Sequence, residues 1–177
     1  MNVFEIDGLI KTDIFKQSVL SNANALRDEV FGVKPRSVHV GDFGESWLEY
    51  DIQDSGLIAD TLASEVIHTW AQSVSNQGLQ LRPSIWANTY TPGQHISWHR
   101  DKYGAVQILL SICQPPPECG GVFQIRRYGI ESDVALYPGD ALLFRAVDIE
   151  HKITPLNATR SNSDPMRISI VARYFSS

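Results

Sequence analysis

The stretch "ANTYTPGQHISWHRDKYG", which runs from Ala87 to Gly104, combines an extended pattern with an unusual density of polar side chains. His99 and Asp101 lie one residue apart within it, and His95 comes four positions before His99. Because side chains alternate between the two faces of a strand, these three are expected on one face and Trp98 on the other. Such groups seldom gather on one strand face for packing alone. His99 and Asp101 are therefore candidate ligands of one metal ion.

From residue 81 onward the sequence consists of short alternating or apolar runs separated by proline and glycine. Turn signals such as "TPG" at 91–93 and "PGD" at 138–140 mark the ends of several runs. We predict strands at 83–90, 95–101, 105–113, 121–127, 132–137, 141–145, 151–154 and 166–175. This number and spacing of strands indicates an α+β, mainly β chain built around a double-sheet jelly roll.

The first 80 residues are expected to contain helices with extended pieces between them. Apolar residues recur with a helical period over 13–30 and again over 57–75. Between these segments, "RSVHVGDFGESWLEYDI" at 36–52 alternates and contains two glycines, which is typical of two strands around a turn. We therefore expect two N-terminal helices packed on the jelly roll.

The overall composition is that of an ordinary globular protein, with 43% hydrophobic and 20% charged residues. A length of 177 residues suits one domain, since a chain of this size can bury roughly 70% of its unfolded surface. We assign 1–177 to a single domain, with 1–80 as support and substrate-side elements and 81–177 as the jelly-roll core. No apolar run is long enough to span a bilayer, so we expect a cytoplasmic location and no membrane contact.

The formal net charge is −5, whereas a protein that follows a phosphate backbone usually carries a basic face. Nucleic acid is therefore a disfavoured partner. Cys113 and Cys119 are separated by "QPPPE", a stiff segment that tends to hold its ends apart, so no disulfide is expected. The sequence does not indicate an oligomeric state.

A third candidate ligand is His151, at the start of a predicted strand after "YPGDALLFRAVDIE". Together with His99 and Asp101 it makes a set of two histidines and one carboxylate. That set is the facial triad of non-haem Fe(II), which leaves coordination positions open for a co-substrate and oxygen. Zinc is the rival metal, because catalytic zinc uses the same ligand types. An oxidisable co-substrate in the same site would favour iron.

The last predicted strand, "RISIVARYF", places Arg167, Ser169 and Arg173 on one face of an otherwise apolar segment. An inward arginine is costly unless it meets an anion, and its planar fork suits a carboxylate. Asn88 and Tyr90 share a face of an earlier strand. These five side chains could hold a dicarboxylate whose other end chelates the metal. For Arg173, pairing with a surface acid near the C-terminus is an equal alternative.

The segment from Asn88 to Phe175 resembles the double-stranded β-helix core of the Fe(II)/2-oxoglutarate-dependent oxygenases. The motifs "NTYTPG", "HRD", His151 and "RISIVAR" are similar in order and spacing to AlkB-type dioxygenases, and "CGGVF" and "HKITPL" resemble small prolyl-hydroxylase-type members. The resemblance implies that Fe(II) is bound by His99, Asp101 and His151, the catalytic centre. It also implies that the 2-oxoglutarate site is formed by Asn88, Tyr90, Arg167 and Arg173.

The activity that this resemblance implies is that of a non-haem dioxygenase, which consumes O2 and 2-oxoglutarate and releases succinate and CO2. AlkB-type enzymes carry an acidic residue soon after the His-x-Asp pair to contact a damaged base, but the matching stretch here is "KYG" at 102–104. We therefore expect hydroxylation or another oxidation of a small-molecule substrate. The alternatives are oxidative demethylation of nucleic acid, hydroxylation of a protein side chain, and a non-enzymatic module that senses 2-oxoglutarate or a metal.

The sequence offers only weak candidates for the wall that contacts the substrate. Trp47 and Tyr50 come from the predicted N-terminal hairpin, and Tyr103 and Arg126 from the core. Each could equally pack in the interior or lie on the surface. His95 shares the strand face of the candidate metal ligands, and its spacing favours a supporting or substrate contact over ligation.

Overall fold

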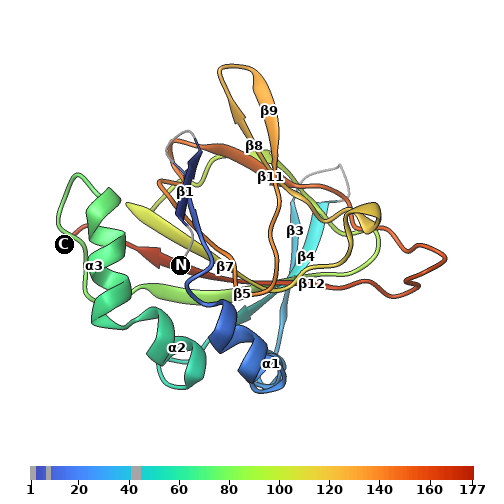
Figure 1. The fold of residues 1–177 in the computed structure, drawn as a ribbon, viewed down its shortest axis with the longest axis horizontal. Coiled ribbons are helices and arrows are strands. Elements are labelled where there is room, and N and C mark those ends of the chain that lie inside the picture. The colour runs from blue at the N-terminus through green and yellow to red at the C-terminus, as the bar shows by residue number, and fades with distance from the viewer. Residues whose placement is uncertain (1–2, 7–8, 41–44) are drawn as a thin grey trace.

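Two antiparallel sheets and three α-helices make up the described part of the chain, which comprises residues 3–6, 9–40 and 45–177 of a computed structural model (Figure 1). The helices are α1 (Lys16–Phe31), α2 (Leu57–Leu62) and α3 (Glu65–Val74), with a 3₁₀ turn at Pro117–Cys119. The strands are β1 (Val3–Ile6), β2 (Leu9–Thr12), β3 (Arg36–Val40), β4 (Glu45–Asp51), β5 (Ser84–Tyr90), β6 (Ile96–His99), β7 (Val106–Cys113), β8 (Phe123–Arg127), β9 (Ile130–Val134), β10 (Ala141–Phe144), β11 (Glu150–Ile153) and β12 (Arg167–Tyr174).

Strands β5 to β12 are divided between two facing sheets, and successive strands change sheet except for β8 and β9, which are neighbours in the small sheet. The large sheet has the order β1-β2-β10-β7-β12-β5-β4-β3, and the small sheet has the order β6-β11-β8-β9. Figure 1 shows the small sheet lying across from the large one, with the helices on the far side of the large sheet. The jelly-roll core with N-terminal helical packing, predicted from strand spacing, is confirmed.

The alternation of β12 separates an apolar core from the space between the sheets. Ile168, Ile170 and Tyr174 belong to the apolar cluster that also includes residues of all three helices. The alternate residues of β12, which are Arg167, Ser169, Val171 and Arg173, therefore face the opposite side of the large sheet, toward the small sheet. Strand β12 is buried on both faces, but its polar side chains all lie on the face toward the small sheet. Those polar groups are the ones that position the candidate site.

The N-terminal part differs from the sequence-based expectation in two ways. β1 and β2 were not predicted, because each is only four residues long and β2 gains its partner from β10, far along the chain. The helix predicted over 57–75 is divided into α2 and α3. A carboxylate from α1 explains the start of α2, since Glu29 accepts a hydrogen bond from the Ile58 amide at 3.1 Å. The turn predicted between β3 and β4 lies outside the described residues.

Both cysteines are free, in agreement with the stiff segment between them. Among the described residues, none of the helices has the length and apolar character needed to cross a membrane.

One glycine next to the small sheet is expected to be indispensable for stability. Gly120 has φ 74° and forms an isolated bridge with Leu156, and a Cβ there would overlap the carbonyl oxygen of Pro155. We expect Gly120→Ala to lower the free energy of unfolding by more than about 3 kcal/mol, measured by urea denaturation. Gly129 is a matched control, with φ 79° and open space around its Cβ position, and should cost only about 1 kcal/mol. Equal losses of unfolding free energy in the two variants would show that the strain of a positive φ, and not the overlap with Pro155, sets the destabilisation.

Candidate metal and carboxylate site

The candidate metal ligands His99 and His151 are brought together by strand pairing. They are directly opposite each other in the β6–β11 ladder, and their ring centroids are 4.3 Å apart. Each ring donates its Nδ1 hydrogen to a backbone carbonyl, from His99 to Ser97 at 2.8 Å and from His151 to Ile149 at 2.9 Å. These bonds fix the tautomer, so that each Nε2 is left with a free lone pair.

Asp101 lies two residues past His99, just beyond the end of β6. Its amide donates a hydrogen bond to the carbonyl of Ala146 at 3.1 Å, which fixes the backbone there. The three candidate ligand atoms of His99, Asp101 and His151 all lie within 4.8 Å of one another. A single ion could therefore contact all three side chains.

The protonation state of His151 suits metal binding. Its side chain is buried against the rings of Phe123 and Phe144, with centroid distances of 5.5 and 5.4 Å. Burial is the main cause, and the neighbouring His99 the second, of a pKa of His151 lowered to about 4. The imidazole is therefore neutral near pH 7, which is the form that ligates a metal.

The buried guanidinium of Arg167 is the second chemical feature of the site. Its side chain has no exposed surface, and burial lowers its pKa only to about 10, so it stays charged near pH 7. Nη1 donates to Gln114 at 3.0 Å, whereas Nε and Nη2 have no partner among the described residues. A buried cation with unused donors is costly unless an anion meets it. Arg167 therefore fits a ligand carboxylate.

The neighbours of Arg167 supply further donors for such a carboxylate. Strand pairing places Arg167 opposite Tyr90 and Ser169 opposite Asn88. Burial raises the pKa of Tyr90 well above its ordinary value, so its phenol keeps its proton and remains a donor. The Tyr90 ring lies 5.8 Å from the Arg167 guanidinium.

A cavity of about 200 Å³ joins the two features. Its wall includes the three candidate metal ligands and, from the large sheet, Trp47, Glu49, Trp86, Asn88, Tyr90, Gln107, Ser169 and Arg173. Arg167 does not line the cavity itself, but its neighbours Tyr90 and Ser169 do. A dicarboxylate in this cavity could contact the metal ligands with one end and the donors around Arg167 with the other.

Several solved structures of Fe(II)/2-oxoglutarate-dependent enzymes share the fold of this chain. A prolyl-4-hydroxylase of Pseudomonas putida matches with a TM-score of 0.76 and 17% identity, covering 96% of this chain and 93% of that one. The chain has the fold of the Fe(II)/2-oxoglutarate oxygenases. A 2OG-Fe(II) oxygenase family protein of Burkholderia pseudomallei matches with a TM-score of 0.72, 12% identity and coverage of 95% and 85%. The non-haem epimerase SnoN from nogalamycin biosynthesis matches with a TM-score of 0.71 and 16% identity, covering 96% of this chain and 78% of that one.

The resemblance predicted from the motifs therefore agrees with the oxygenase fold. No family model matches the sequence, and no curated protein matches it. The similarity to these solved structures is thus a similarity of backbone fold, at 12–17% sequence identity.

Arg173 has an internal partner in this oxygenase fold. Its Nη2 lies 2.8 Å from Oδ2 of Asp101, without the alignment of a hydrogen bond, and its Nε and Nη2 donate to Gln107 at 3.1 and 2.7 Å. The guanidinium also lies 4.8 Å from the ring centroid of Trp86. The acid that pairs with Arg173 is thus a candidate metal ligand and not a surface residue. Arg173 is placed to orient that ligand.

The predicted substrate-wall residues lie in different places. Trp47 lines the cavity, but Tyr50 belongs to the helix-side core, where it packs 5.5 Å from Phe31. The Tyr103 side chain is exposed, and it is absent from the cavity wall.

Arg126 faces outward from the small sheet. It lies 4.1 Å from the Trp98 ring centroid and forms ion pairs with Glu131 and Glu150. The strand alternation predicted Trp98 on the face opposite the metal ligands, and an outward Trp98 is consistent with that.

His95 does not line the cavity either. Its amide donates to the carbonyl of Ser46 at 3.3 Å, and its buried Nδ1 has no partner among the described residues. Glu49, Trp86 and Gln107 are among the cavity residues that the sequence did not single out. Alternation was an available signal for Trp86, which is two residues before Asn88 on β5, and for Glu49, which is two residues after Trp47 on β4. Gln107 is brought to the wall by pairing across strands.

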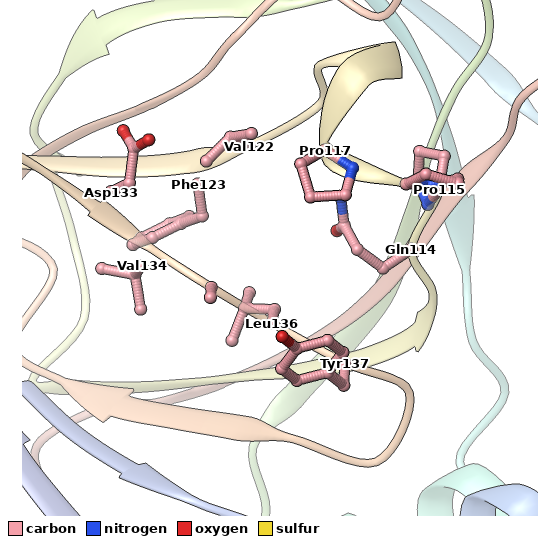
Figure 2. A pocket seen from close by; sticks show the side chains of 11 residues that line it. Gln114, Pro115, Pro117, Val122, Phe123, Asp133, Val134, Leu136 and Tyr137 are labelled. Carbon is pink, nitrogen blue, oxygen red and sulfur yellow. The ribbon is translucent and has the colours of Figure 1, made fainter.

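A larger cavity, of about 420 Å³, lies at another edge of the small sheet and contains few polar groups (Figure 2). Phe123, Val134, Leu136 and Tyr137 line one side in that view, and the proline segment that follows Gln114 lines the other. It holds none of the candidate metal ligands. Size alone therefore does not mark the reactive site of this chain.

Proposed function

We propose that this protein is a non-haem Fe(II)/2-oxoglutarate-dependent dioxygenase that hydroxylates or otherwise oxidises a small-molecule substrate. The observation that carries the proposal is a three-ligand cluster on one side of a cavity whose other side leads to the unsatisfied buried guanidinium of Arg167. The cluster alone would also suit zinc. A buried anion site next to it favours iron with a dicarboxylate co-substrate.

The roles of the individual residues follow from the donor set. His99, Asp101 and His151 would hold Fe(II), and Arg167 with Tyr90 would hold the distal carboxylate of 2-oxoglutarate. When both are bound, the metal and co-substrate supply oxidation by O2, with release of succinate and CO2.

The protein itself contributes placement and a dry environment. The two imidazoles and one carboxylate, which come from neighbouring elements, would supply three ligands to Fe(II), a set that leaves coordination positions for a co-substrate and oxygen. Arg173 pairs with the Asp101 carboxylate and orients it. Leu109, Phe123 and Ile153 line the same cavity with apolar surface, which excludes water from the reacting groups.

The choice of a small substrate rests on the cavity and on charge. A volume of about 200 Å³ must hold both co-substrate and the reacting part of the substrate. The net charge is −5, and the "KYG" segment offers no carboxylate for a damaged base. The neighbour SnoN is an epimerase from nogalamycin biosynthesis, which is a precedent for small molecules. The prolyl-4-hydroxylase is a precedent for the alternative of protein side chains.

The deciding experiment measures succinate formed from 2-oxoglutarate with added Fe(II), O2 and candidate substrates. We expect a slow reaction without substrate and stimulation by a small metabolite. We also expect no stimulation by methylated single-stranded DNA or RNA, and no binding of either at physiological salt. Formaldehyde release from a methylated oligonucleotide, with binding that weakens steeply with salt, would instead favour the demethylase. A complete absence of succinate, with 2-oxoglutarate bound, would favour a sensing module.

A further inference from the structure

One part of the cavity wall is built from the neighbouring strands β4 and β5 of the large sheet, on the side of β12 away from β7. Trp47 and Glu49 are two residues apart on β4, so both point to the same side of the sheet, and both line the cavity. Glu49 lies directly opposite Asn88 in the ladder with β5, and Trp86 lines the cavity from the same strand. This wall of Trp47, Glu49 and Trp86 contains none of the residues to which we assign iron or 2-oxoglutarate.

Glu49 has capacity left for a ligand. Its side chain is only 16% exposed, whereas Arg36, its ion-pair partner on the neighbouring strand β3, is 67% exposed. The contact uses Oε1 of the carboxylate, and a carboxylate has a second oxygen with further acceptor sites. An ion pair with so exposed an arginine is weak and easily exchanged. Glu49 can therefore accept a second donor without losing a strong bond.

The two arginines at the cavity already have partners inside the protein or in the proposed co-substrate, whereas Glu49 is paired only with an exposed arginine. Arg173 already contacts Asp101 and Gln107. Arg167 bonds Gln114 and is the proposed partner of the co-substrate. A substrate anion would therefore find no free cation in the described wall, whereas a substrate cation would find the carboxylate of Glu49.

Trp47 supplies a second, independent indication of a ligand. Its side chain is 8% exposed and its Nε1 hydrogen is buried without an acceptor among the described residues. The indole stacks on Tyr90, with ring centroids 6.5 Å apart and an interplanar angle of 27°, so its orientation is fixed. A buried indole donor usually finds a hydrogen-bond partner. Positions two apart on a strand are separated by about 6.6 Å, a span that one small molecule can bridge.

We propose that the primary substrate is a small molecule with a protonated amine, which binds Glu49, and a carbonyl or similar acceptor, which binds Trp47. The inference rests on the proposed function, because it assigns the rest of the cavity to iron and 2-oxoglutarate. Glu49 is then the residue that selects cationic over neutral and anionic substrates.

The probes for this inference are L-phenylalaninamide and 3-phenyllactamide, which differ in an ammonium versus a hydroxyl group. Binding is measured by calorimetry at about pH 6.5, where the ammonium is charged, under anaerobic conditions with Fe(II) and 2-oxoglutarate and again without them. We expect the charged probe to bind roughly tenfold more tightly than its neutral isostere, as one charge-assisted hydrogen bond allows.

Two variants test the carboxylate through effects of opposite sign. Glu49→Gln preserves the shape and should abolish the preference between the two probes, as in a double-mutant cycle. Arg36→Ala removes the competing cation and should strengthen binding of L-phenylalaninamide about threefold, leaving 3-phenyllactamide unchanged. If the ion pair were merely structural, both variants would weaken binding of both probes.

The outcomes separate this inference from the proposed function. Equal binding of the two probes to the wild-type protein, or weaker binding in Arg36→Ala, would overturn the cation site even if succinate is formed. Charge-dependent binding that Glu49→Gln abolishes, in a protein that forms no succinate from 2-oxoglutarate, would support the cation site and overturn the oxygenase.

Discussion

Replacing His151 with alanine is expected to abolish turnover and to weaken Fe(II) binding by more than about 100-fold. The variant removes one of the three ligands that lie within 4.8 Å of one another, and no other histidine lines the cavity apart from His99 in the described part of the chain. Iron affinity is measured by titration of the anaerobic protein, and turnover by succinate formation. Circular dichroism checks the fold, because the His151 ring also packs against Phe123 and Phe144.

His95→Ala is the matched control for this prediction. The sequence places His95 on the same strand face as His99, but the structure keeps it out of the cavity wall. We expect its iron affinity to remain within about threefold of the wild-type value, as for a residue without metal contact. Full activity in His151→Ala, or loss of iron in His95→Ala alone, would show that the ligand set is wrongly assigned.

The parts of the site that the sequence predicted are those encoded within a single strand. A histidine and an aspartate at alternate positions identify one face, and arginines at alternate positions in an apolar strand identify another. Alternation within one strand is enough for such inferences, because it assigns side chains to a face without knowledge of distant partners, and in the largely buried β12 a polar exception is easy to see. The double-sheet jelly roll was predicted from the same kind of local evidence, the number and spacing of short strands.

The parts that the sequence did not predict depend on pairing between distant segments. The ion pair of Arg173 with Asp101 requires knowledge that the end of β12 lies beside the loop after β6. Glu49 enters the cavity wall because β4 pairs with β5 in one particular register. A shift of one residue would turn Glu49 to the other face of the sheet. No pattern within β4 alone specifies that register.

Arg167→Met is expected to raise the apparent Michaelis constant for 2-oxoglutarate by tens-fold or more, because a buried charged partner is worth about 2–5 kcal/mol to a bound carboxylate. Methionine fills a similar volume without a charge. The constant is measured by succinate formation at varied 2-oxoglutarate. An unchanged constant would move the carboxylate anchor elsewhere, with Arg173 as the next candidate.

The stability of the same variant provides a test that does not depend on turnover. In the ligand-free protein, Arg167 is a fully buried cation with two nitrogens that lack partners among the described residues. Removing an uncompensated buried charge relieves its desolvation cost, so Arg167→Met should unfold at a higher temperature than the wild type without ligand. Added 2-oxoglutarate and metal should stabilise the wild type and have less effect on the variant. If Arg167 served only for packing, the variant would not be the more stable protein without ligand and the less stabilised one with ligand. If Arg167 binds an anion, both effects must be observed.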